Sequence, residues 1–432
     1  MRGWKTLPVL LVLLLAASTS FAAGFRLPEA GVKAMGMGFA FTAQADDPSA
    51  IYFNPAGLTQ LTGQNVMVGV TYVRENGAEF TGTTPVDNQT AIKNETQKSL
   101  NFYIPNAYYT RTTPDGYIAY GVGIFAPFGL GQEYNDKNTS IFRNQITKID
   151  LQTIVVNPTI AFKINEYLSV GFGVDWMYGK AKLDKTPWVP GVGNLYNVDL
   201  DGDGDAWGYN VGLLLKPTEN FRIGVNYRSG FDLKVKNADV NIGNTSPAYG
   251  SGSGLLGPTP SSTRGSATIA MPATFALGAA YTMGKLTLEA DADWTLWHSF
   301  TSLPITIENQ VPTLRSTNTQ KNWEDVCALR FGAEYRVTDP LSLRVGVVFD
   351  PSPVPASTMG PELPDSDRMN YMIGAGYKIG RWTIDVAGMY IDKKDRTVNN
   401  QANTTPVSQG TGFNGTWTGD AWLAGLDVGY KF

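Results

Sequence analysis

Residues Lys285–His298, KLTLEADADWTLWH, alternate between apolar and polar side chains without a break. Leu286 and Leu288 fall on one face of a strand and Glu289 and Asp291 on the other, because the side chains of a strand switch faces at every residue. The run exceeds the ~9–11 residues that a tilted strand needs to cross a bilayer. Acidic side chains opposite a continuous apolar face are typical of a water-lined barrel interior. The stretch therefore predicts an all-β fold, a transmembrane antiparallel β-barrel.

The two ends of the chain favour the same fold in a bacterial outer membrane. Residues 1–22 are predicted to be a secretory signal, because two basic residues precede the apolar run Leu7–Ala17 and Ser20-Phe21-Ala22 has the small-x-small pattern of a cleavage site. An uncleaved membrane anchor is the alternative. At the other end, an alternating run that starts at Trp422 closes on Phe432, as the last strand of an outer-membrane barrel does.

Composition narrows the classes of protein further. No stretch after residue 22 approaches the ~20 apolar residues of a spanning helix. Since only helices and closed barrels satisfy every backbone donor in a bilayer, membrane residence must come from strands. The chain holds 20 tyrosines, 20 phenylalanines, 10 tryptophans and 47 glycines, and its net charge of −4 argues against a nucleic-acid partner. The single cysteine, Cys327, excludes an internal disulfide and a cysteine-rich metal site. We expect no metal and no cofactor.

Fourteen strand candidates can be read between about residue 65 and the C-terminus, and boundary errors of ~2–4 residues leave twelve or sixteen as alternatives. The predicted spans are 65–80, 97–112, 116–127, 149–164, 167–184, 205–217, 220–235, 266–283, 285–298, 323–337, 340–350, 368–380, 381–395 and 419–432. Short turns alternate with long polar loops, as they do at the two ends of an outer-membrane barrel. The long loops are predicted near 81–96, 128–148, 185–204, 236–265, 299–322, 351–367 and 396–418.

Residues 23–64 do not alternate. They are rich in glycine and alanine and end in Asn54-Pro55-Ala56-Gly57-Leu58. A barrel of fourteen strands leaves a lumen that wall side chains cannot fill. We therefore predict that residues 23–64 form a hatch, or plug, inside a barrel of residues 65–432. A periplasmic extension is the alternative.

Several short motifs recur in a fixed order along this pattern. They are Ala23-Gly24-Phe25, Ala45-Asp46-Asp47, Asn54-Pro55-Ala56, Pro127-Phe128-Gly129-Leu130 with Glu133-Tyr134, Phe349-Asp350-Pro351-Ser352-Pro353-Val354-Pro355 and Pro364-Asp365-Ser366-Asp367-Arg368. On these motifs the chain resembles the FadL/TodX family, outer-membrane transporters of long-chain fatty acids and other hydrophobic compounds. The resemblance covers essentially the whole mature sequence. It implies a fourteen-stranded barrel blocked by an N-terminal hatch, with ligand captured outside, bound inside and released sideways through a gap in the wall.

The third predicted strand has a physical basis for such a gap. It contains Gly121 and Gly123 and reaches Pro127, with Phe128 and Gly129 just beyond. Proline has no N–H for the ladder and belongs at edges or bulges, so Pro127 is expected to bend the strand. The resemblance places the lateral gate at Pro127, Phe128 and Gly129. Alternatively, Pro127 simply ends the strand above the membrane.

Three residues are candidates for ligand contact. The alternation that starts at Leu168 places Lys185 on the lumen side, and the resemblance implies that a basic residue at this position contacts the fatty-acid headgroup. A lysine there offers a point charge rather than the bidentate fork of an arginine; a solvated loop lysine is the alternative. Lys321 is a second candidate cation, although alternation in the next strand puts it on the outward side. Phe25 is expected to line the pocket or to anchor the plug.

Two other motifs have structural alternatives. Asn54-Pro55-Ala56 is predicted to form a rigid turn that fixes the hatch against the wall near the exit. The acidic run Asp199-Leu200-Asp201-Gly202-Asp203-Gly204-Asp205 resembles the start of a calcium-binding loop, but no glutamate follows at the twelfth position. It is either a weak extracellular calcium site or an acidic solvated loop.

The sequence therefore favours passive uptake of hydrophobic molecules, long-chain fatty acids first. A neutral aromatic hydrocarbon channel, a structural or adhesive barrel and a general porin remain alternatives. An enzyme is not expected, because the usual general base is histidine and the chain has only His298. The expected partners are the hydrophobic ligand, outer-membrane lipid and lipopolysaccharide, the last at the outward-facing Lys180 and Lys182. A lateral exit must face lipid, so we expect a monomer.

Overall fold

The computed structural model describes residues 24–84, 92–134, 139–186, 188–189, 193–194, 196–244, 262–308, 316–401 and 412–432. The predicted signal, residues 1–22, lies outside the described residues. Within the described residues, no helix is long and apolar enough to cross a membrane.

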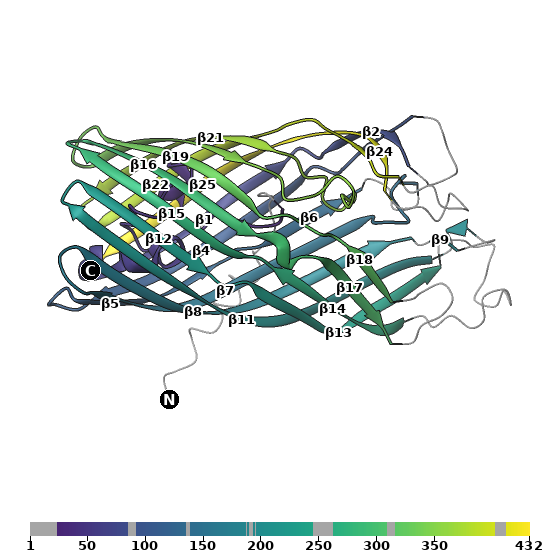
Figure 1. Cartoon of the computed structure of the whole chain (residues 1–432), viewed down its shortest axis with the longest axis horizontal. Coiled ribbons are helices and arrows are strands. Elements are labelled where there is room, and N and C mark those ends of the chain that lie inside the picture. The colour runs from purple at the N-terminus through teal and green to yellow at the C-terminus, as the bar shows by residue number, and fades with distance from the viewer. Residues whose placement is uncertain are drawn as a thin grey trace.

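The described strands form a closed antiparallel barrel of fourteen wall strands, some of them interrupted and so carrying two labels (Figure 1). The first seven are β1 (Gln64–Glu75) with β2 (Glu79–Thr83), β3 (Lys93–Thr96) with β4 (Leu100–Thr112), β5 (Ile118–Phe125) with β6 (Gly129–Glu133), β7 (Lys148–Lys163), β8 (Leu168–Lys185), β11 (Tyr196–Thr218), and β12 (Phe221–Arg228) with β13 (Phe231–Asn244). The other seven are β14 (Ser262–Met271) with β15 (Ala273–Met283), β16 (Leu286–Leu296) with β17 (Ser302–Ile307), β18 (Thr317–Gln320) with β19 (Val326–Arg336), β20 (Leu341–Asp350), β21 (Arg368–Ile379), β22 (Trp382–Lys393) with β23 (Arg396–Asn399), and β24 (Asn414–Thr418) with β25 (Asp420–Lys431). β9 (Trp188–Val189) and β10 (Gly193–Asn194) pair with each other.

The barrel closes between its first and last strands. β1 pairs antiparallel with β25 from Asn65 opposite Lys431 to Glu75 opposite Ala421. On the far side of β1 the ladder continues to β4. The predicted count of fourteen strands is therefore confirmed.

The short turns gather at one end of the barrel, where the C-terminus also lies (Figure 1). The tightest of them join β15 to β16 and β21 to β22. Gly284 and Gly380 occupy these two turns with φ of +61° and +59°, a backbone region that residues with a Cβ rarely adopt. The short turns lie in the narrow gaps between the predicted strand spans, as between 266–283 and 285–298 and between 368–380 and 381–395.

At the opposite end the strands run farther than predicted. β3, β6, β17, β18, β23 and β24 lie in stretches that the sequence placed in long loops, and β11, β13 and β14 extend into such stretches. Here β2, β3, β23 and β24 form a small sheet of their own. In several of these extensions the polar side chains face outward and apolar ones, such as Leu200, Leu233 and Val240, are buried inside. The outward apolar pattern that marks a membrane strand is therefore lost although the ladder continues.

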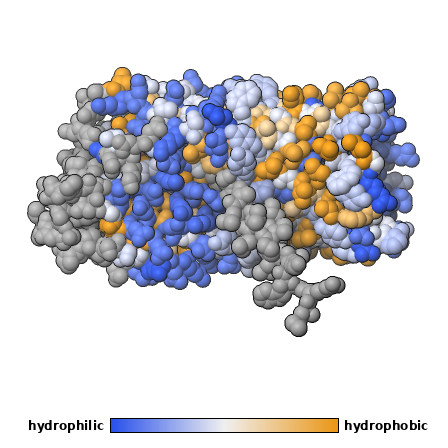
Figure 2. Space-filling view, turned by 180° about the vertical axis from the view of Figure 1, so that it is seen from behind, coloured by the Kyte–Doolittle hydropathy of each residue, from blue (hydrophilic) through white to orange (hydrophobic). Residues whose placement is uncertain are grey.

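An apolar belt surrounds the half of the barrel with the short turns. Figure 2 shows orange side chains gathered toward that end and blue ones toward the other. The belt includes the exposed side chains of Val68, Val70, Ile160, Phe162, Phe172, Val174, Val211, Leu213, Leu277, Leu288, Phe331, Val345, Ile373, Val386 and Leu426. The wall therefore has a lipid-facing half and a half that projects beyond the membrane.

The N-terminal residues 24–61, here called the inner segment, lie inside the barrel. Their short helices are α2 (Val32–Gly36), α3 (Ala50–Phe53) and η1 (Pro55–Gln60). α2 contacts β20, β21, β22 and β25, whereas η1 contacts β5, β7, β8 and β11. The inner segment thus reaches wall strands from both halves of the chain, and the buried core lies between it and the wall.

Candidate functional site

The acidic face of β16 holds the inner segment. Asp291 accepts hydrogen bonds from the backbone N–H groups of Phe41 and Thr42, each at 2.9 Å, and Glu289 accepts one from Ala43 at 2.7 Å. Both carboxylates are buried, with Glu289 3% and Asp291 4% exposed. The inward register predicted for these residues is confirmed. The prediction that they face water is wrong, because backbone donors of the inner segment replace the water.

Further contacts fix α2 to other strands of the wall. Asp427 in β25 accepts a hydrogen bond from the backbone N–H of Val32 at 2.6 Å. The Lys33 ammonium lies 2.7 Å from Asp46 and 3.8 Å from Glu334 in β19. Burial by itself would lower the pKa of Lys33, but these two carboxylates raise it above its usual value. The Lys33 ammonium therefore stays charged and ties the segment to the wall.

Glycines in the wall let the inner segment approach this closely. A Cβ on Gly346 would lie 2.0 Å from the backbone nitrogen of Gly38, and one on Gly332 would lie 2.3 Å from the carbonyl oxygen of Met37. Both atoms belong to backbone that cannot rotate away. Glycine is therefore required at these wall positions.

The Asn54-Pro55-Ala56 motif forms the rigid turn predicted for it. The Asn54 carboxamide accepts from the N–H of Ala56 at 3.1 Å and donates to the carbonyl of Leu213 in β11 at 2.9 Å. The backbone of Pro55 lies against Gly171 in β8. The motif therefore starts η1 and attaches it to two neighbouring wall strands.

Phe25 lies at the centre of an aromatic cluster, here defined as Phe25, Phe128, Trp297, Phe300 and Trp323. The centroid of its ring lies 6.1 Å from Phe128, 4.7 Å from Trp297 and 5.5 Å from both Phe300 and Trp323. Phe25 is only 3% exposed. Edge-to-face contacts of this kind add to the burial of apolar area, so the cluster is a rigid apolar wall.

Pro127 interrupts the third wall strand rather than ending it. Phe125 in β5 pairs with Val155, and Gly129 in β6 pairs with Gln152. Residues 126–128 therefore bulge opposite only Thr153 and Ile154. The alternative that the strand ends at Pro127 is wrong, because β6 continues it.

The inner segment supplies hydrogen bonds that this bulge cannot make within the sheet. The N–H of Leu27 donates to the carbonyl of Pro127 at 2.8 Å, and the N–H of Gly129 donates to the carbonyl of Phe25 at 2.9 Å. Thr153 also bonds both the N–H and the carbonyl of Phe128. The bulge is thus attached to the same residues that form the aromatic cluster.

The wall ladder is incomplete beside the bulge. β4 pairs with β5 only between Ala107 and Thr112. β6 pairs with β7, and the third wall strand meets the second again only at its outer end, where the N–H of Lys98 donates to the carbonyl of Glu133 and Gln97 bridges Tyr134. Within the described chain, the edge of β4 from residue 100 to 106 has no ladder partner on this side. Side chains and the inner segment, rather than backbone hydrogen bonds, close this part of the wall.

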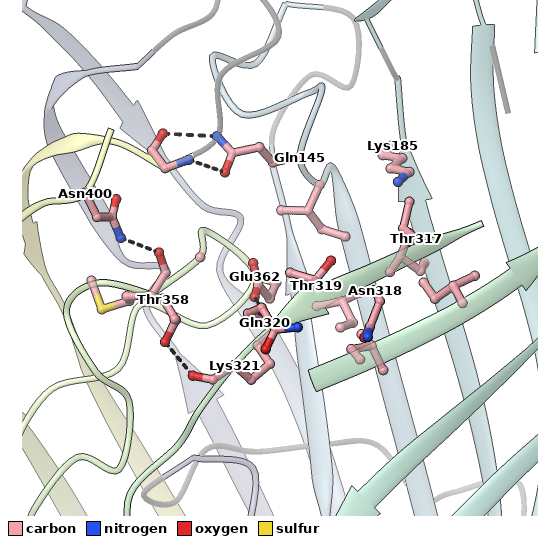
Figure 3. A pocket seen from close by; sticks show the side chains of 18 of the residues that line it. Gln145, Lys185, Thr317, Asn318, Thr319, Gln320, Lys321, Thr358, Glu362 and Asn400 are labelled. Atoms are coloured by element: carbon pink, nitrogen blue, oxygen red, sulfur yellow. Dashed lines mark hydrogen bonds and ion pairs between the residues drawn. The ribbon is translucent and has the colours of Figure 1, made fainter. Parts of the chain in front are cut away.

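An outer cavity of about 740 Å³ opens among the extended ends of β8, β17 and β18 (Figure 3). Lys185, the last residue of β8, and Thr317 lie on one side of it, and Thr358 and Asn400 lie on the other. Lys185 therefore lies on the lumen side, as alternation predicted. Among the described residues its ammonium has neither an ion pair nor a hydrogen-bond partner.

A smaller inner cavity of about 70 Å³ adjoins the outer one. The two cavities share six lining residues, namely Ile149, Leu183, Leu303, Ile305, Lys321 and Glu362. Much of the rest of the inner lining is apolar and includes Phe25, Leu130, Ile269, Phe300, Trp323 and Leu363. A single apolar path therefore leads from the outer cavity to the aromatic cluster.

Lys321 does not face outward, so the prediction from alternation is wrong. Its side chain is buried, and its ammonium forms an ion pair with Glu362. Residues 321–325 lie between β18 and β19 and belong to neither strand. The inward–outward alternation of β19 therefore does not extend to Lys321. The residue lines both cavities, but its charge is already neutralised.

Sequence reasoning did not select Trp297, Phe300 or Trp323 as site residues. Phe300 fell in a predicted loop, and Trp297 stood at the end of a predicted strand. Trp297 nevertheless carried a signal, since it is an aromatic residue on the face of that strand that otherwise holds acids and threonines.

The acidic run from Asp199 to Asp205 lies within β11, so the prediction of a loop is wrong. Its aspartates are every second residue of the strand and so all lie on the outer face. There Asp201 forms ion pairs with Lys182 at 2.6 Å and Lys180 at 3.6 Å. A strand cannot fold these carboxylates around one ion as a loop does. The described residues contain no cluster of metal-ligating side chains.

Comparisons with known proteins agree with this architecture. The sequence model of the family described as "Outer membrane protein transport protein (OMPP1/FadL/TodX)" matches residues 13–432. The chain is 27% identical to a putative outer membrane protein of Neisseria meningitidis, with 96% of each chain covered. It is 25% identical to a long-chain fatty acid transport protein of Escherichia coli, covering 97% of this chain and 96% of that one.

Solved structures share the fold. A Pseudomonas aeruginosa FadL homologue superimposes with a TM-score of 0.81 at 21% identity, covering 95% of this chain and 100% of the other. The Pseudomonas putida toluene transporter TodX gives 0.71 at 17% identity, with the same coverage. The family consists of transport proteins of the outer membrane and not of enzymes. With its fourteen-stranded barrel and a family match over nearly its whole length, this chain belongs to the OMPP1/FadL/TodX family of outer membrane transport proteins.

Proposed function

We propose that the protein takes up long-chain fatty acids passively across the outer membrane. The observation that carries this proposal is the Lys185 ammonium, which has no partner among the described residues and lies on a cavity that continues into an apolar one. A carboxylate bound there gains a charge-assisted hydrogen bond. Its hydrocarbon chain gains about 25 cal/mol for each Å² of apolar surface removed from water.

The ligand enters with its headgroup near Lys185. Its chain then passes between Ile149 and Leu183, which line both cavities, and ends against the aromatic cluster at Phe25. Lys321 contributes less to headgroup binding, because its ammonium is held by Glu362. The headgroup and the hydrocarbon chain of an amphiphile thus bind in separate regions, one polar and one apolar.

Release occurs sideways, at a lateral gate formed by Pro127, Phe128 and Gly129. The absence of a ladder between β4 and β6 supports this exit, since a continuous ladder would have to break to let a ligand pass. The inner segment acts as the hatch. Because Phe25 and Leu27 are hydrogen-bonded to the bulge, a movement of the hatch changes the shape of the gate.

A lateral exit restricts what can lie next to the barrel in the membrane. The gap beside β4 must face lipid, which favours a monomer. Lys180 and Lys182 face outward above the apolar belt and are placed to meet lipopolysaccharide phosphates, although Asp201 neutralises part of their charge.

An aromatic hydrocarbon is a second candidate ligand. The inner cavity is small and bordered by the rings of Phe25, Phe300 and Trp323, a lining that suits a compact ring without a headgroup. Relatives carry both kinds of name, long-chain fatty acid transport protein and toluene transporter.

Equilibrium binding of labelled oleate and labelled toluene to the purified protein in detergent tests the proposal. For fatty-acid uptake, we expect oleate to bind and Lys185→Ala to weaken its binding. Lys180→Ala is the matched control, since it removes a lysine from the outer face of the same strand and should leave oleate binding unchanged. Toluene binding without oleate binding would establish the hydrocarbon channel. Binding of neither ligand would refute uptake of both classes.

A further inference from the structure

The seventh, eighth and ninth wall strands are all interrupted at one place. β12 ends at Arg228 and β13 begins at Phe231. Pro272 separates β14 from β15, and the 3₁₀ turn η3 (Trp297–Ser299) separates β16 from β17. Three neighbouring interruptions at one level form a second discontinuity of the wall, distinct from the bulge at Pro127.

The ladder is missing across this second discontinuity. β15 pairs with β16 as far as Ala273 opposite Leu296. β14 pairs with β17 only from Gly265 to Ala267, because η3 inserts extra residues into the ninth strand. The edge of β14 between residues 268 and 271 therefore has no strand partner on this side among the described residues.

A groove of about 580 Å³ lies outside the discontinuity. We call it the side groove and define it by Trp207, Tyr227, Phe231, Met271, His298 and Ser299. Phe231 and Met271 lie at its floor; their side chains point into the barrel, and the two residues are 3% and 1% exposed.

These floor residues adjoin the apolar path inside the barrel. The ring of Phe231 lies 6.2 Å from that of Phe128, a member of the aromatic cluster. On the other side, Met271 ends the strand whose inward residues Ala267 and Ile269 line the inner cavity. Side chains, and not a hydrogen-bonded ladder, separate the inner cavity from the side groove.

The groove has the polarity that an amphiphile needs. Its apolar part includes Trp207, which is 66% exposed at the outer edge of the apolar belt. Asp205, Lys234 and His298 supply charged or titratable groups at its rim, and His298 is held by Asp325 at 2.8 Å. A ligand lying here would keep its hydrocarbon against aromatic side chains and its headgroup in water.

We propose that this discontinuity is a second lateral passage, through which the hydrophobic ligand moves between the inner cavity and the outer leaflet. The proposal rests on the proposed function, because it takes the cavity to hold a fatty acid. Passage requires Phe231 and Met271 to change side-chain rotamer, whereas no ladder hydrogen bond needs to break. The protein then has two exits from one binding cavity, the bulge at Pro127 and the side groove.

Photocrosslinking of the wild-type protein with a diazirine-bearing fatty acid tests occupancy of the passage without any substitution. We expect adducts on Trp207 and Tyr227, which point outward into the side groove, in addition to adducts on Phe128 and Phe300 inside the barrel. Excess unlabelled oleate should remove all of them. Adducts on Phe128 and Phe300 without any on Trp207 or Tyr227 would overturn the second passage while leaving fatty-acid uptake intact. Absence of every adduct would refute both.

Transport through the passage is tested by closing each exit in turn. Deleting Pro127 makes residues 126–128 match Thr153 and Ile154, and so restores the register of the third wall strand. Ala273→Trp places a large ring in the side groove. Ala279→Trp is the matched control, since Ala279 lies on the same outer face of β15 away from the groove.

We expect the Pro127 deletion to keep part of the wild-type oleate uptake and added Ala273→Trp to abolish the remainder. Added Ala279→Trp should leave the remainder unchanged. Complete loss of uptake in the Pro127 deletion alone, or equal effects of the two tryptophans, would overturn the proposal. Heat-modified migration on gels verifies that each variant is a folded barrel. If a variant does not fold, the crosslinking of the wild-type protein decides whether the second passage exists.

Discussion

Asp291→Ala provides a direct test of how the inner segment is held. The carboxylate accepts two backbone hydrogen bonds, from Phe41 and Thr42, at 2.9 Å each. A hydrogen bond to a charged group contributes roughly 1.5–3 kcal/mol, so the pair contributes roughly 3–6 kcal/mol to keeping the segment against β16. Since about 1.4 kcal/mol changes an equilibrium constant tenfold, the release of the segment should become at least about a hundredfold more favourable.

Release can be read with a thiol probe. Ala40 is fully buried in the inner segment, so Ala40→Cys in a Cys327→Ser background reacts with a maleimide only when the segment leaves the wall. We expect Asp291→Ala to speed this labelling and to raise the conductance of the barrel in planar bilayers. Both readouts report the same displacement.

Thr287→Ala is the matched control on the lumen face of the same strand. The Thr287 hydroxyl bonds Thr282 within the wall and not the inner segment, so its removal should leave labelling and conductance as in the wild type. If Asp291→Ala also labels at the wild-type rate, backbone bonds to the acidic face do not hold the segment and the reasoning fails.

Three further predictions concern the packing of the lumen. Gly346→Ala should lower the urea midpoint, because its Cβ would overlap the backbone of Gly38 and overpacking costs about 1–3 kcal/mol. Gly388→Ala should not, because the nearest atom to its Cβ is the Leu423 carbonyl oxygen at 3.9 Å, an ordinary contact; equal midpoints would contradict the close approach. Phe25→Ala should cost about 3–5 kcal/mol in the same assay, and an unchanged midpoint would mean that the aromatic cluster does not bear on stability. Burial raises the pKa of Glu29 from 4.5 to about 7, so the folded state binds the proton more tightly than the unfolded state. The contribution of Glu29 to the free energy of unfolding is then fully present below about pH 4.5 and is lost as the pH rises through about 7, by about 3 kcal/mol. Glu29→Gln should flatten that dependence, and a wild-type profile that is already flat would contradict it.

Local alternation was sufficient to predict much of the wall. The run Lys285–His298 became β16 with Leu288 outward and Glu289 inward, because a lipid-facing strand repeats every second residue. The fourteen strands and the short turns followed from the same pattern. The family, too, was evident from motifs such as Asn54-Pro55-Ala56, which needed no tertiary contact to be read.

Alternation failed where strands leave the bilayer or the ladder. Asp199–Asp205 was predicted to be a loop but is a strand. Its outer face carries only aspartates and its inner face carries Leu200 and two glycines, so it lacks the outward apolar residues by which membrane strands are recognised. Lys321 was placed outward but lies inward, because the intervening residues are not part of a ladder that preserves parity.

The sequence by itself determined that this chain is a β-barrel and which face of each membrane strand is polar. Only the tertiary structure decided what touches that polar face. Asp291 and Glu289 meet backbone N–H groups of the inner segment instead of water, and Pro127 bonds Leu27. The physical reason is that alternation records the polarity of a surface, whereas the partner that satisfies that polarity comes from residues some 250 positions away in the chain and is chosen only when the barrel closes around them.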